Sequence, residues 1–300
     1  FYGKNIVLAS LYLSTGDTNY IHNTVIDGDS SNCNLVISGD IDSTSRISGF
    51  TIQNGIGCVY GQGAGIYIEG SSPRLDNLII KDNHSSTNGG GVCINMGASP
   101  ILENITIHNN SSGFGGGIYS SISSPTITNC TIKNNYALAG AGCAFDASNP
   151  VLEYVSITDN ISSDQGGGIF CTSYSQSQFT NVTITNNSAS NGGGLFSEES
   201  SYTVFTNSIF WNNHPEEILS HQLRSARQEE TNLVQKEPTR CDLNQKKCQF
   251  HSCLSFQIPQ SGCHIYLQLR SSQQKLVLVQ KFQIWSLYNS LDHARVSNQI

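Results

Sequence analysis

The chain has 300 residues, of which 12% are charged and 28 are glycine, and its net charge is −7. Residues 1–213 carry five Lys or Arg against fifteen Asp or Glu, a net charge of −10, whereas residues 214–300 carry ten against seven, a net charge of +3. The acidic first part argues against nucleic-acid binding. No run of 18 apolar residues occurs, which excludes a transmembrane helix.

The first part of the chain predicts an opening coil of three short strands. These strands are expected at residues 6–9, 24–26 and 35–38, with a loop around residues 14–20, and a degenerate copy of the later repeat follows at residues 47–54. Four acidic residues crowd these first coils: Asp27, Asp29, Asp40 and Asp42. Calcium binding and turn formation are both open for them, but their spacing matches no EF-hand or nonapeptide calcium loop. Turn formation is therefore favoured, and no metal site is predicted.

Residues 63–213 contain six copies of a sequence repeat of about 26 residues. The copies open on glycine, at Gly63, Gly89, Gly115, Gly140, Gly166 and Gly192. In each copy apolar residues alternate over one short stretch and recur in two more, as Ile118, Ile127 and Ile132 do in the third copy. A period of two residues is typical of strands with one buried face. Each copy therefore predicts three short β-strands and no helix.

Two columns of polar residues mark the predicted corners. One column, after the third strand, is filled by asparagine in all six copies: Asn83, Asn110, Asn135, Asn160, Asn187 and Asn213. The other, between the second and third strands, holds asparagine in five copies and Tyr154 in the fourth copy. Asparagine tolerates the left-handed backbone of a bend, and its amide donates to and accepts from a neighbour above and below. We therefore predict asparagine ladders at two corners, and a third corner formed by glycine clusters such as residues 115–117.

One copy is too small to bury a core alone, so each copy must pair its strands with the next. The predicted fold is all-β: a right-handed, single-stranded parallel β-helix of about eight coils, with three strands per coil and a rise of about 4.8 Å per coil. The predicted β-helix domain covers residues 1–213. Because the chain opens within the pattern and shows no signal peptide, we interpret it as a fragment whose export signal lies upstream.

Residues 214–300 form an atypical tail in which the repeat stops. They contain one glycine and thirteen glutamines, against five glutamines in all preceding residues. Three interpretations remain open: a separate module, a poorly ordered extension, and the product of a shifted reading frame. The last two are favoured together, because solenoids seldom change composition within a coil.

The cysteines favour neither disulfides nor a metal centre. Cys130, Cys143 and Cys171 fall on core columns of different coils, where a free cysteine packs as a small apolar residue. Core packing is therefore favoured over disulfide pairing for these three. Cys241, Cys248, Cys253 and Cys263 of the tail match no zinc-binding spacing. No metal or other cofactor is predicted.

The repeat resembles a known superfamily. Its clearest copy reads Gly-Gly-Gly-Ile-Tyr at residues 115–119 and Ser-Pro-Thr-Ile-Thr-Asn-Cys-Thr-Ile-Lys-Asn-Asn at residues 124–135. This phrase resembles the pectin-lyase-like right-handed β-helix proteins, and it is most similar to their bacterial surface and secreted branch, which includes the repeats of polymorphic outer-membrane proteins. The resemblance covers about residues 46–213. It implies the fold and an extracellular or cell-surface location, but it does not choose between lyases, hydrolases and adhesins.

The candidate site lies on the outward side of the first strand of each copy. The place between the two core positions holds Tyr67, Cys93, Tyr119, Ala144, Phe170 and Phe196, and the next outward place holds Glu69, Asn95, Ser121, Asp146, Thr172 and Glu198. Aromatic rings beside carboxylates suit contact with a sugar chain. The candidate glycan-contact face is Tyr67, Glu69, Tyr119, Asp146, Phe170, Phe196 and Glu198. Plain sheet packing of the aromatic residues is the competing explanation.

No catalytic residues are assigned. Asp146 and Glu198 stand two coils apart, hence about 10 Å, near the upper limit for an inverting glycosidase. The arginine, lysine and aspartate patterns of pectin-degrading enzymes are missing. The first hypothesis is a non-catalytic, secreted or cell-surface module that offers a polar face to polysaccharides or surface proteins. The alternatives are a polysaccharide lyase or glycoside hydrolase, acting on uronate-rich or neutral chains, and a decayed fragment without activity.

Overall fold

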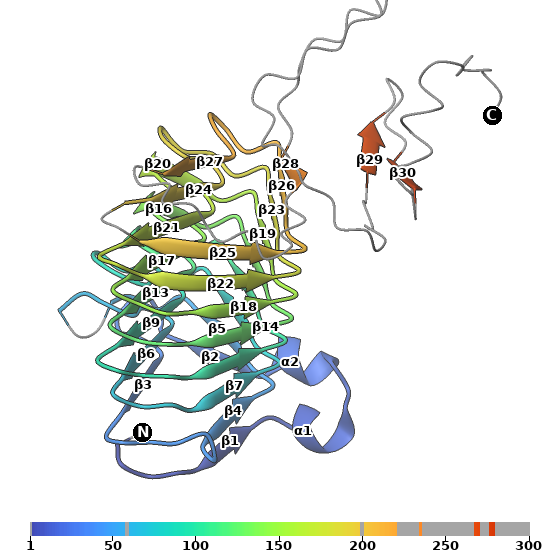
Figure 1. The fold of residues 1–300 in the computed structure, drawn as a ribbon. Coiled ribbons are helices and arrows are strands. Elements are labelled where there is room, and N and C mark those ends of the chain that lie inside the picture. The colour runs from blue at the N-terminus through green and yellow to red at the C-terminus, as the bar shows by residue number, and fades with distance from the viewer. Residues whose placement is uncertain are drawn as a thin grey trace, which may run out of the picture. The chain divides into compact units, whose positions relative to one another are not determined.

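The computed structural model describes residues 2–57, 60–198 and 201–220, together with short strands at residues 234–235, 267–270 and 276–279. The chain divides into two compact units, residues 1–236 and 237–300. The first unit is a parallel β-helix, in which the chain winds through stacked coils (Figure 1). In the second unit, strand β29 (Leu267–Arg270) pairs antiparallel with β30 (Leu276–Val279). The tail predicted at residues 214–300 lies largely outside the described residues.

Three main sheets form the walls of the β-helix. The first sheet contains β3 (Leu35–Ser38), β6 (Ile66–Glu69), β9 (Val92–Asn95), β13 (Ile118–Ser121), β17 (Cys143–Asp146), β21 (Ile169–Thr172), β24 (Leu195–Ser197) and β27 (Ile218–Ser220). The second sheet contains β1 (Val7–Ala9), β4 (Arg46–Ser48), β7 (Arg74–Asp76), β10 (Ile101–Glu103), β14 (Thr126–Thr128), β18 (Val151–Glu153), β22 (Gln176–Thr180) and β25 (Tyr202–Thr206).

The third sheet completes each coil. It contains β2 (Val25–Asp27), β5 (Thr51–Gln53), β8 (Ile79–Lys81), β11 (Thr106–His108), β15 (Thr131–Lys133), β19 (Ser156–Thr158), β23 (Thr183–Thr185), β26 (Ile209–Trp211) and β28 (Val234–Gln235). Every neighbouring pair in the three main sheets is parallel, and like positions of successive copies face each other, as Ile132 faces Ile157. Eight or nine strands per sheet agree with the prediction of about eight coils.

The interior is filled by files of aliphatic side chains. Along the third sheet Ile80, Ile107, Ile132, Ile157 and Ile184 are each 0% exposed. Burial of one such side chain contributes about 1.5–3 kcal/mol relative to exposure. Cys130, Cys143 and Cys171 join this core as buried free thiols, which confirms their prediction as packing residues. Burial raises the pKa of Cys130 and of Cys171 to about 12, so both thiols stay protonated.

The predicted asparagine ladder runs along the corner after the third strand. Asn110 Nδ2 donates to Asn135 Oδ1 at 3.1 Å and to the Ile80 carbonyl at 3.0 Å. Asn110 Oδ1 accepts from the backbone N–H and the Nδ2 of Asn83, at 3.1 and 2.9 Å. The same contacts recur through Asn160 to Asn187. Each of these buried amides uses its full hydrogen-bonding capacity, which offsets the cost of removing it from water.

Different residues finish the two ends of the ladder. Near the N-terminus the position is held by Gly55, and Asn34 instead supplies an amide that donates to Asn83 Oδ1 at 3.0 Å. At the other end Asn213 donates through its backbone N–H and its Nδ2 to Glu217 Oε2, at 3.3 and 2.5 Å. Glu217 is buried, and β27 follows it directly and pairs with β24. The paired strands thus continue beyond Asn213, where the predicted domain ends.

The bend at this corner is made by the residue before each ladder asparagine. Asn109 and Asn134 have φ of 57° and 53°, whereas Asn110 and Asn135 do not have positive φ. The sequence interpretation gave both tasks to one column, and that assignment was wrong. The left-handed residue bends the chain, and the next residue then points its buried amide inward for stacking. At the corner between the second and third strands, Asn129 and Tyr154 are left-handed, with φ of 54° and 56°.

The glycine corner has two separate requirements. Gly115 has φ of +65°, which favours glycine, but Gly117 does not. A Cβ on Gly117 would lie 2.6 Å from the Gly142 carbonyl oxygen and 3.1 Å from Asn135 Nδ2. Close packing of one coil on the next therefore requires this glycine.

Two regions depart from the predicted three strands per coil. A fourth, short sheet contains β12 (Ser111–Phe114), β16 (Tyr136–Ala139) and β20 (Ile161–Gln165), between the ladder and the glycine corner. The loop predicted around residues 14–20 contains the helices α1 (Tyr12–Thr15) and α2 (Asn19–Asn23), which lie at one side of the first coils in Figure 1, with α2 in contact with β5.

Two of the four acidic residues in the first coils form turns. Asp27 and Asp42 accept backbone N–H groups two residues ahead, which supports their turn-forming role.

One buried charge sits on the outer side of the second sheet. The Asp76 carboxylate, 1% exposed, accepts from Arg46 Nε and Nη2 at 2.6 and 2.8 Å and from the Ser48 hydroxyl at 2.8 Å. Burial alone would raise the pKa of Asp76, but hydrogen bonds from Arg46, Ser48 and Asn77 bring it below its usual value. Arg74 also pairs with Glu103. These contacts join successive coils of the second sheet.

Candidate functional site

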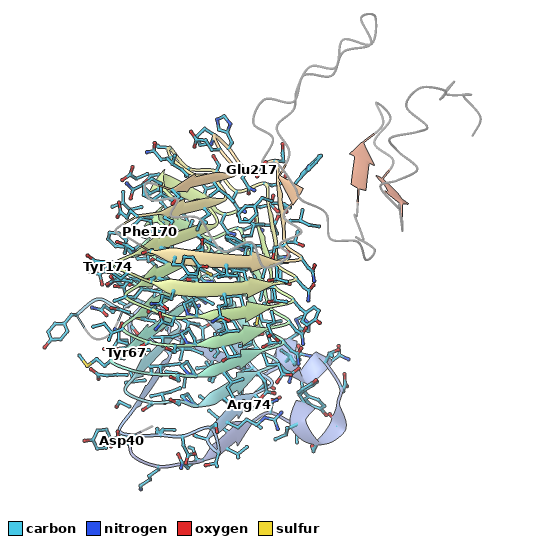
Figure 2. All side chains as sticks on the ribbon, viewed as in Figure 1. Asp40, Tyr67, Arg74, Phe170, Tyr174 and Glu217 are labelled. Carbon is cyan, nitrogen blue, oxygen red and sulfur yellow. The ribbon has the colours of Figure 1, made fainter. Side chains whose placement is uncertain are left out.

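The outward aromatic column of the first sheet is covered rather than open. Tyr67, Phe170 and Phe196 are only 3%, 5% and 2% exposed. For Phe170 and Phe196 the covering includes the segment of the short sheet, because Ala139 of β16 packs in one cluster with them and with Ala144. The sequence interpretation placed this column at an accessible face, which was wrong for these side chains. Figure 2 shows all side chains on the ribbon and labels Tyr67 and Phe170.

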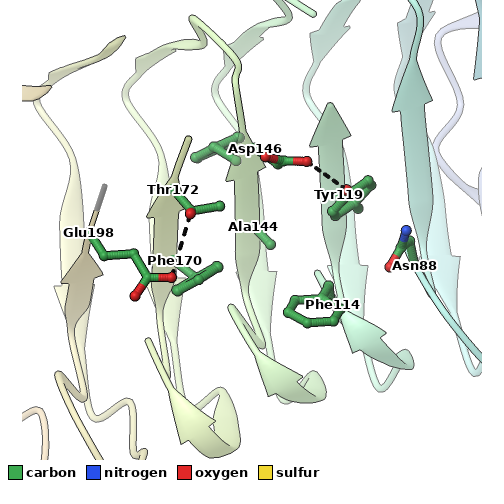
Figure 3. Close-up of a pocket in the computed structure, with 9 residues that line it drawn as sticks. Asn88, Phe114, Tyr119, Ala144, Asp146, Phe170, Thr172 and Glu198 are labelled. Atoms are coloured by element: carbon green, nitrogen blue, oxygen red, sulfur yellow. Dashed lines mark hydrogen bonds between the residues drawn. The ribbon is translucent and has the colours of Figure 1, made fainter. Parts of the chain in front are cut away.

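A shallow, open hollow lies where this covering is incomplete. Its volume is about 310 Å³. The lining residues come from five successive coils and are Asn88, Phe114, Tyr119, Ala144, Phe145, Asp146, Phe170, Thr172 and Glu198. Figure 3 shows Ala144 between Tyr119 and Phe170, where its single methyl group leaves room for the hollow. The hollow exists because one rung of an otherwise aromatic stretch carries a small residue.

Aromatic rings form one side of the hollow. Phe114 of β12 is 38% exposed, and its ring centroid lies 6.4 Å from that of Phe170. Phe170 stacks in turn on the buried Phe196, at 5.9 Å and an interplanar angle of 24°. These contacts fix the ring of Phe170 from both sides. Phe114 therefore offers the accessible apolar surface, and Phe170 supports it.

Two carboxylates form the polar side. Asp146 Oδ2 accepts from the Tyr119 hydroxyl at 3.3 Å and from the Ser121 hydroxyl at 3.2 Å. Glu198 Oε1 accepts from the Thr172 hydroxyl at 3.5 Å (Figure 3). Burial, and then the charge of Asp146, raises the pKa of Tyr119 to about 12, so its hydroxyl stays protonated. Each carboxylate is thus oriented by a neighbour in the sheet and still reaches the hollow.

The structure brings together part of the predicted face. Tyr119, Asp146, Phe170 and Glu198 line the hollow. Phe196 lies beneath it as a buried support. Tyr67 and Glu69, on β6, are separated from β13 by β9 and do not line it. Only four of the seven predicted residues therefore share one surface.

The sequence interpretation did not select Asn88, Phe114, Ala144 or Thr172 as contact residues. Phe114 was not selected because the residues before the glycines were interpreted as part of a corner. In the structure, exposed and buried residues alternate along Tyr136–Ala139. All four of these residues are apolar, so their sequence shows no alternation of polar and apolar residues that would have predicted a strand there.

The composition of the hollow limits its chemistry. Among the described residues, no Lys, Arg or His lines it, so none of them supplies a cation to balance the two carboxylates. The backbones of Asp146 and Glu198 are two strand spacings apart, or about 10 Å, which is near the upper end of the carboxylate separation of roughly 6.5–9.5 Å in inverting glycosidases. Rings and carboxylates of this kind can pack against the C–H faces of a neutral sugar and accept hydrogen bonds from its hydroxyl groups.

Within the described residues, no three or more His, Cys, Asp or Glu side chains gather as possible metal ligands. Among the helices described, none has the length and apolar character needed to cross a bilayer.

One family description matches this chain. It is that of a right-handed β-helix region, and it matches residues 9–162 and 114–273, which together cover most of the sequence. Comparison with curated proteins and comparison with solved structures both give no match.

Proposed function

The chain belongs to the right-handed β-helix family, and we propose that it is a non-catalytic, extracellular or cell-surface module that contacts neutral glycan chains. The observation that carries this proposal is the outer hollow, where Phe114, Asp146 and Glu198 meet on one surface. An aromatic face provides apolar contact for a sugar ring, and fixed carboxylates accept its hydroxyl protons. The described lining residues include two carboxylates and no cation, which disfavours uronate-rich chains because the carboxylates would repel them.

Binding to an open hollow of this kind is expected to be weak for a single sugar. The hollow itself extends from Tyr119 on β13 to Glu198 after β24, so a chain of several sugars can contact more than one rung. We therefore expect affinity to rise with chain length, from mono- to hexasaccharide, in calorimetric titrations with cello-, xylo- and chito-oligosaccharides. Equal affinity for the mono- and hexasaccharide of a series would contradict an extended contact.

Substitution of Phe114 by alanine tests the role of the hollow. Phe114 is partly exposed, so its loss removes ligand contact with little effect on the core. We expect hexasaccharide affinity to fall about tenfold, as is typical for removal of an aromatic contact. Tyr60→Ala is the matched control, because Tyr60 is 90% exposed and does not line the hollow. An equal loss of hexasaccharide affinity in both variants would show that the hollow is not the binding site.

Glycoside hydrolysis is the second candidate, because Asp146 and Glu198 line the same hollow. Its test is the appearance of new reducing ends, or of unsaturated products for a lyase, during incubation with neutral and uronate-rich polysaccharides. We expect neither above a blank. Products that disappear in Asp146→Asn and Glu198→Gln would overturn the non-catalytic assignment and assign the reaction to this pair.

A further inference from the structure

A file of exposed side chains runs along the corner between the first and second sheets. Each member follows a strand of the first sheet within two residues, and those strands pair in register from one coil to the next. We call this file the apolar ridge; its members are Met96, Ile122, Ala147 and Tyr174. Met96, Ile122 and Tyr174 are 66%, 66% and 72% exposed, and Tyr174 is labelled at one edge of the β-helix in Figure 2.

The backbone conformation of the apolar ridge disfavours the residues that occupy it. Met96, Ile122 and Ala147 have φ of 60°, 49° and 48°, and Tyr174 has φ of 63°. A β-branched or bulky residue is rare in this left-handed region, which glycine and asparagine tolerate best. In the preceding coil this corner holds Gly70, with φ of 54°. The ridge residues therefore cost conformational free energy, and their exposure shows that burial does not offset it.

The other left-handed corners of the same coils show what the fold alone requires. The bend before the asparagine ladder is made by Asn or Asp in every coil from Asn54 to Asn212. The corner between the second and third sheets holds asparagine from Asn77 to Asn207, with Tyr154 as the one exception among the described coils. Strained residues that the fold does not require are typical of functional surfaces. The apolar ridge therefore points to a contact outside the domain.

Acidic residues border the apolar ridge on one side. The outward place just before this corner holds three of them: Glu69, Asp146 and Glu198. None of the three forms an ion pair with a described residue. On the other side, the described residues beside the start of the second sheet are neutral: Ser72, Ser99, Ser124, Asn149 and Gln176. An apolar file with an unbalanced negative border suits a partner that is both apolar and basic.

The spacing of the apolar ridge fits the side of an α-helix. Neighbouring coils are about 4.8 Å apart, so the file covers about 14 Å from Met96 to Tyr174. Successive turns of an α-helix are about 5.4 Å apart, whereas side chains on one face of a strand are about 6.6 Å apart. Side chains on three turns of a helix can therefore pack between the ridge residues.

A second copy of this chain suits the apolar ridge less well. Stable dimers bury about 800 Å² on each partner, which four side chains in one file do not supply. Two copies would also bring together their acidic borders and the net charge of −10 that each carries over residues 1–213. Size and charge therefore both favour a small basic partner over self-association.

We propose that the apolar ridge is a docking surface for a basic amphipathic helix of a partner protein. The apolar stripe of this helix covers Met96, Ile122 and Tyr174, and its Lys or Arg side chains meet Glu69 and Asp146. The inference goes beyond the proposed glycan contact and does not depend on it, because the ridge residues do not line the hollow.

The test uses the full chain and a fluorescent helical peptide of about 15 residues, with leucines along one stripe and lysines elsewhere. Its counterpart has glutamate for lysine, and anisotropy titrations should show the lysine peptide binding at least about tenfold more tightly. Ile122→Asn should weaken binding of the lysine peptide about tenfold. Tyr154→Asn is the matched control at another exposed left-handed corner and should change binding by less than about twofold.

Thermal unfolding separates docking from a structural role. Asparagine tolerates the left-handed backbone better than isoleucine, so Ile122→Asn should raise the melting temperature by about 2 °C while it weakens peptide binding. A lower melting temperature would show that Ile122 makes a contact that the fold needs, and it would overturn the proposal.

Other outcomes would also overturn the proposal. Equal loss of peptide affinity in Ile122→Asn and Tyr154→Asn, or equal binding of both peptides, would show that the apolar ridge does not dock a basic helix. A dimer in sedimentation velocity that Ile122→Asn abolishes would assign the ridge to a second copy. Binding of phosphatidylcholine vesicles that Ile122→Asn abolishes would assign it to a membrane surface.

The two proposals fail separately. Phe114→Ala should leave binding of the lysine peptide unchanged, and Ile122→Asn should leave binding of the neutral hexasaccharide unchanged. Loss of hexasaccharide binding alone therefore concerns the hollow, and loss of peptide binding alone concerns the apolar ridge.

Discussion

The asparagine corner and the outer hollow use polar side chains differently. Each inner ladder amide is buried and makes four hydrogen bonds, as Asn110 does. In the outer hollow, the carboxylates of Asp146 and Glu198 are partly exposed. The ladder amides have no remaining capacity for a ligand. The two carboxylates are held on one side by neighbours and face solvent on the other. The same coil therefore uses polar groups for stability at one corner and keeps them available on another face.

The largest effect is expected inside the ladder. Asn135→Ala would leave the backbone N–H and the Nδ2 of Asn110 without their acceptor and would remove two donated bonds. We expect the free energy of unfolding to fall by about 3 kcal/mol. Urea denaturation followed by circular dichroism measures this change.

The neighbouring residue supplies the control for that experiment. Asn134 is exposed and left-handed, with φ of 53°. Asn134→Ala carries the same chemical change but costs only the left-handed preference, about 1 kcal/mol. Equal losses in the two variants would show that amide stacking is not what distinguishes the corner.

The next effect concerns the one deeply buried carboxylate of the second sheet. Asp76→Asn should destabilise the fold by about 2 kcal/mol, because Arg46 loses a charged partner. The pKa of Asp76 is lower in the folded state than its usual 3.8. Its contribution is therefore present above about pH 4 and is lost as the pH falls through the folded value.

This pH dependence can be measured directly. The difference in unfolding free energy between the wild type and Asp76→Asn should be constant from pH 5 to 7 and should shrink below pH 4. A difference that instead grew on acidification would contradict the pairing of Asp76 with Arg46.

Filling the hollow should affect binding more than stability. Ala144→Leu places additional carbon atoms between Tyr119 and Phe170, where the opening lies. We expect oligosaccharide affinity to fall at least tenfold, or about 1.4 kcal/mol. Thermal unfolding checks that the fold is retained, and Ala144→Ser is the control of nearly unchanged volume. Full binding by Ala144→Leu would show that the ligand contacts another face.

The smallest effect should be a gain in stability. Tyr154 occupies a left-handed corner position where the other copies have asparagine, and its side chain is 61% exposed. Tyr154→Asn should raise the free energy of unfolding by about 0.5–1 kcal/mol, because asparagine tolerates this conformation better. Denaturation of Tyr154→Asn beside the wild type measures it, and a loss of stability would indicate that the ring makes a favourable contact.

The interior of this protein was more predictable than its exterior. Files such as Ile107 and Ile132, and the ladder from Asn83 to Asn213, follow from the repeat alone, since stacking places like residues over one another. The outer face depends on how the segment before the glycines folds back, and each copy has different residues there. The hollow arises from one substitution in a column, Ala144, and from Phe114 beside it. Aligned repeats predict the core and ladder positions that all coils share, but they do not predict a surface feature that occurs in only one coil.

Native mass spectrometry of the protein with a neutral hexasaccharide tests the functional account most directly, because it reports binding and the mass of the bound chain together. The account predicts a complex with one intact hexasaccharide for the wild type, reduced about tenfold in Phe114→Ala and unchanged in Tyr60→Ala. A shortened or unsaturated chain, or a complex equally abundant in wild type and Phe114→Ala, would contradict it.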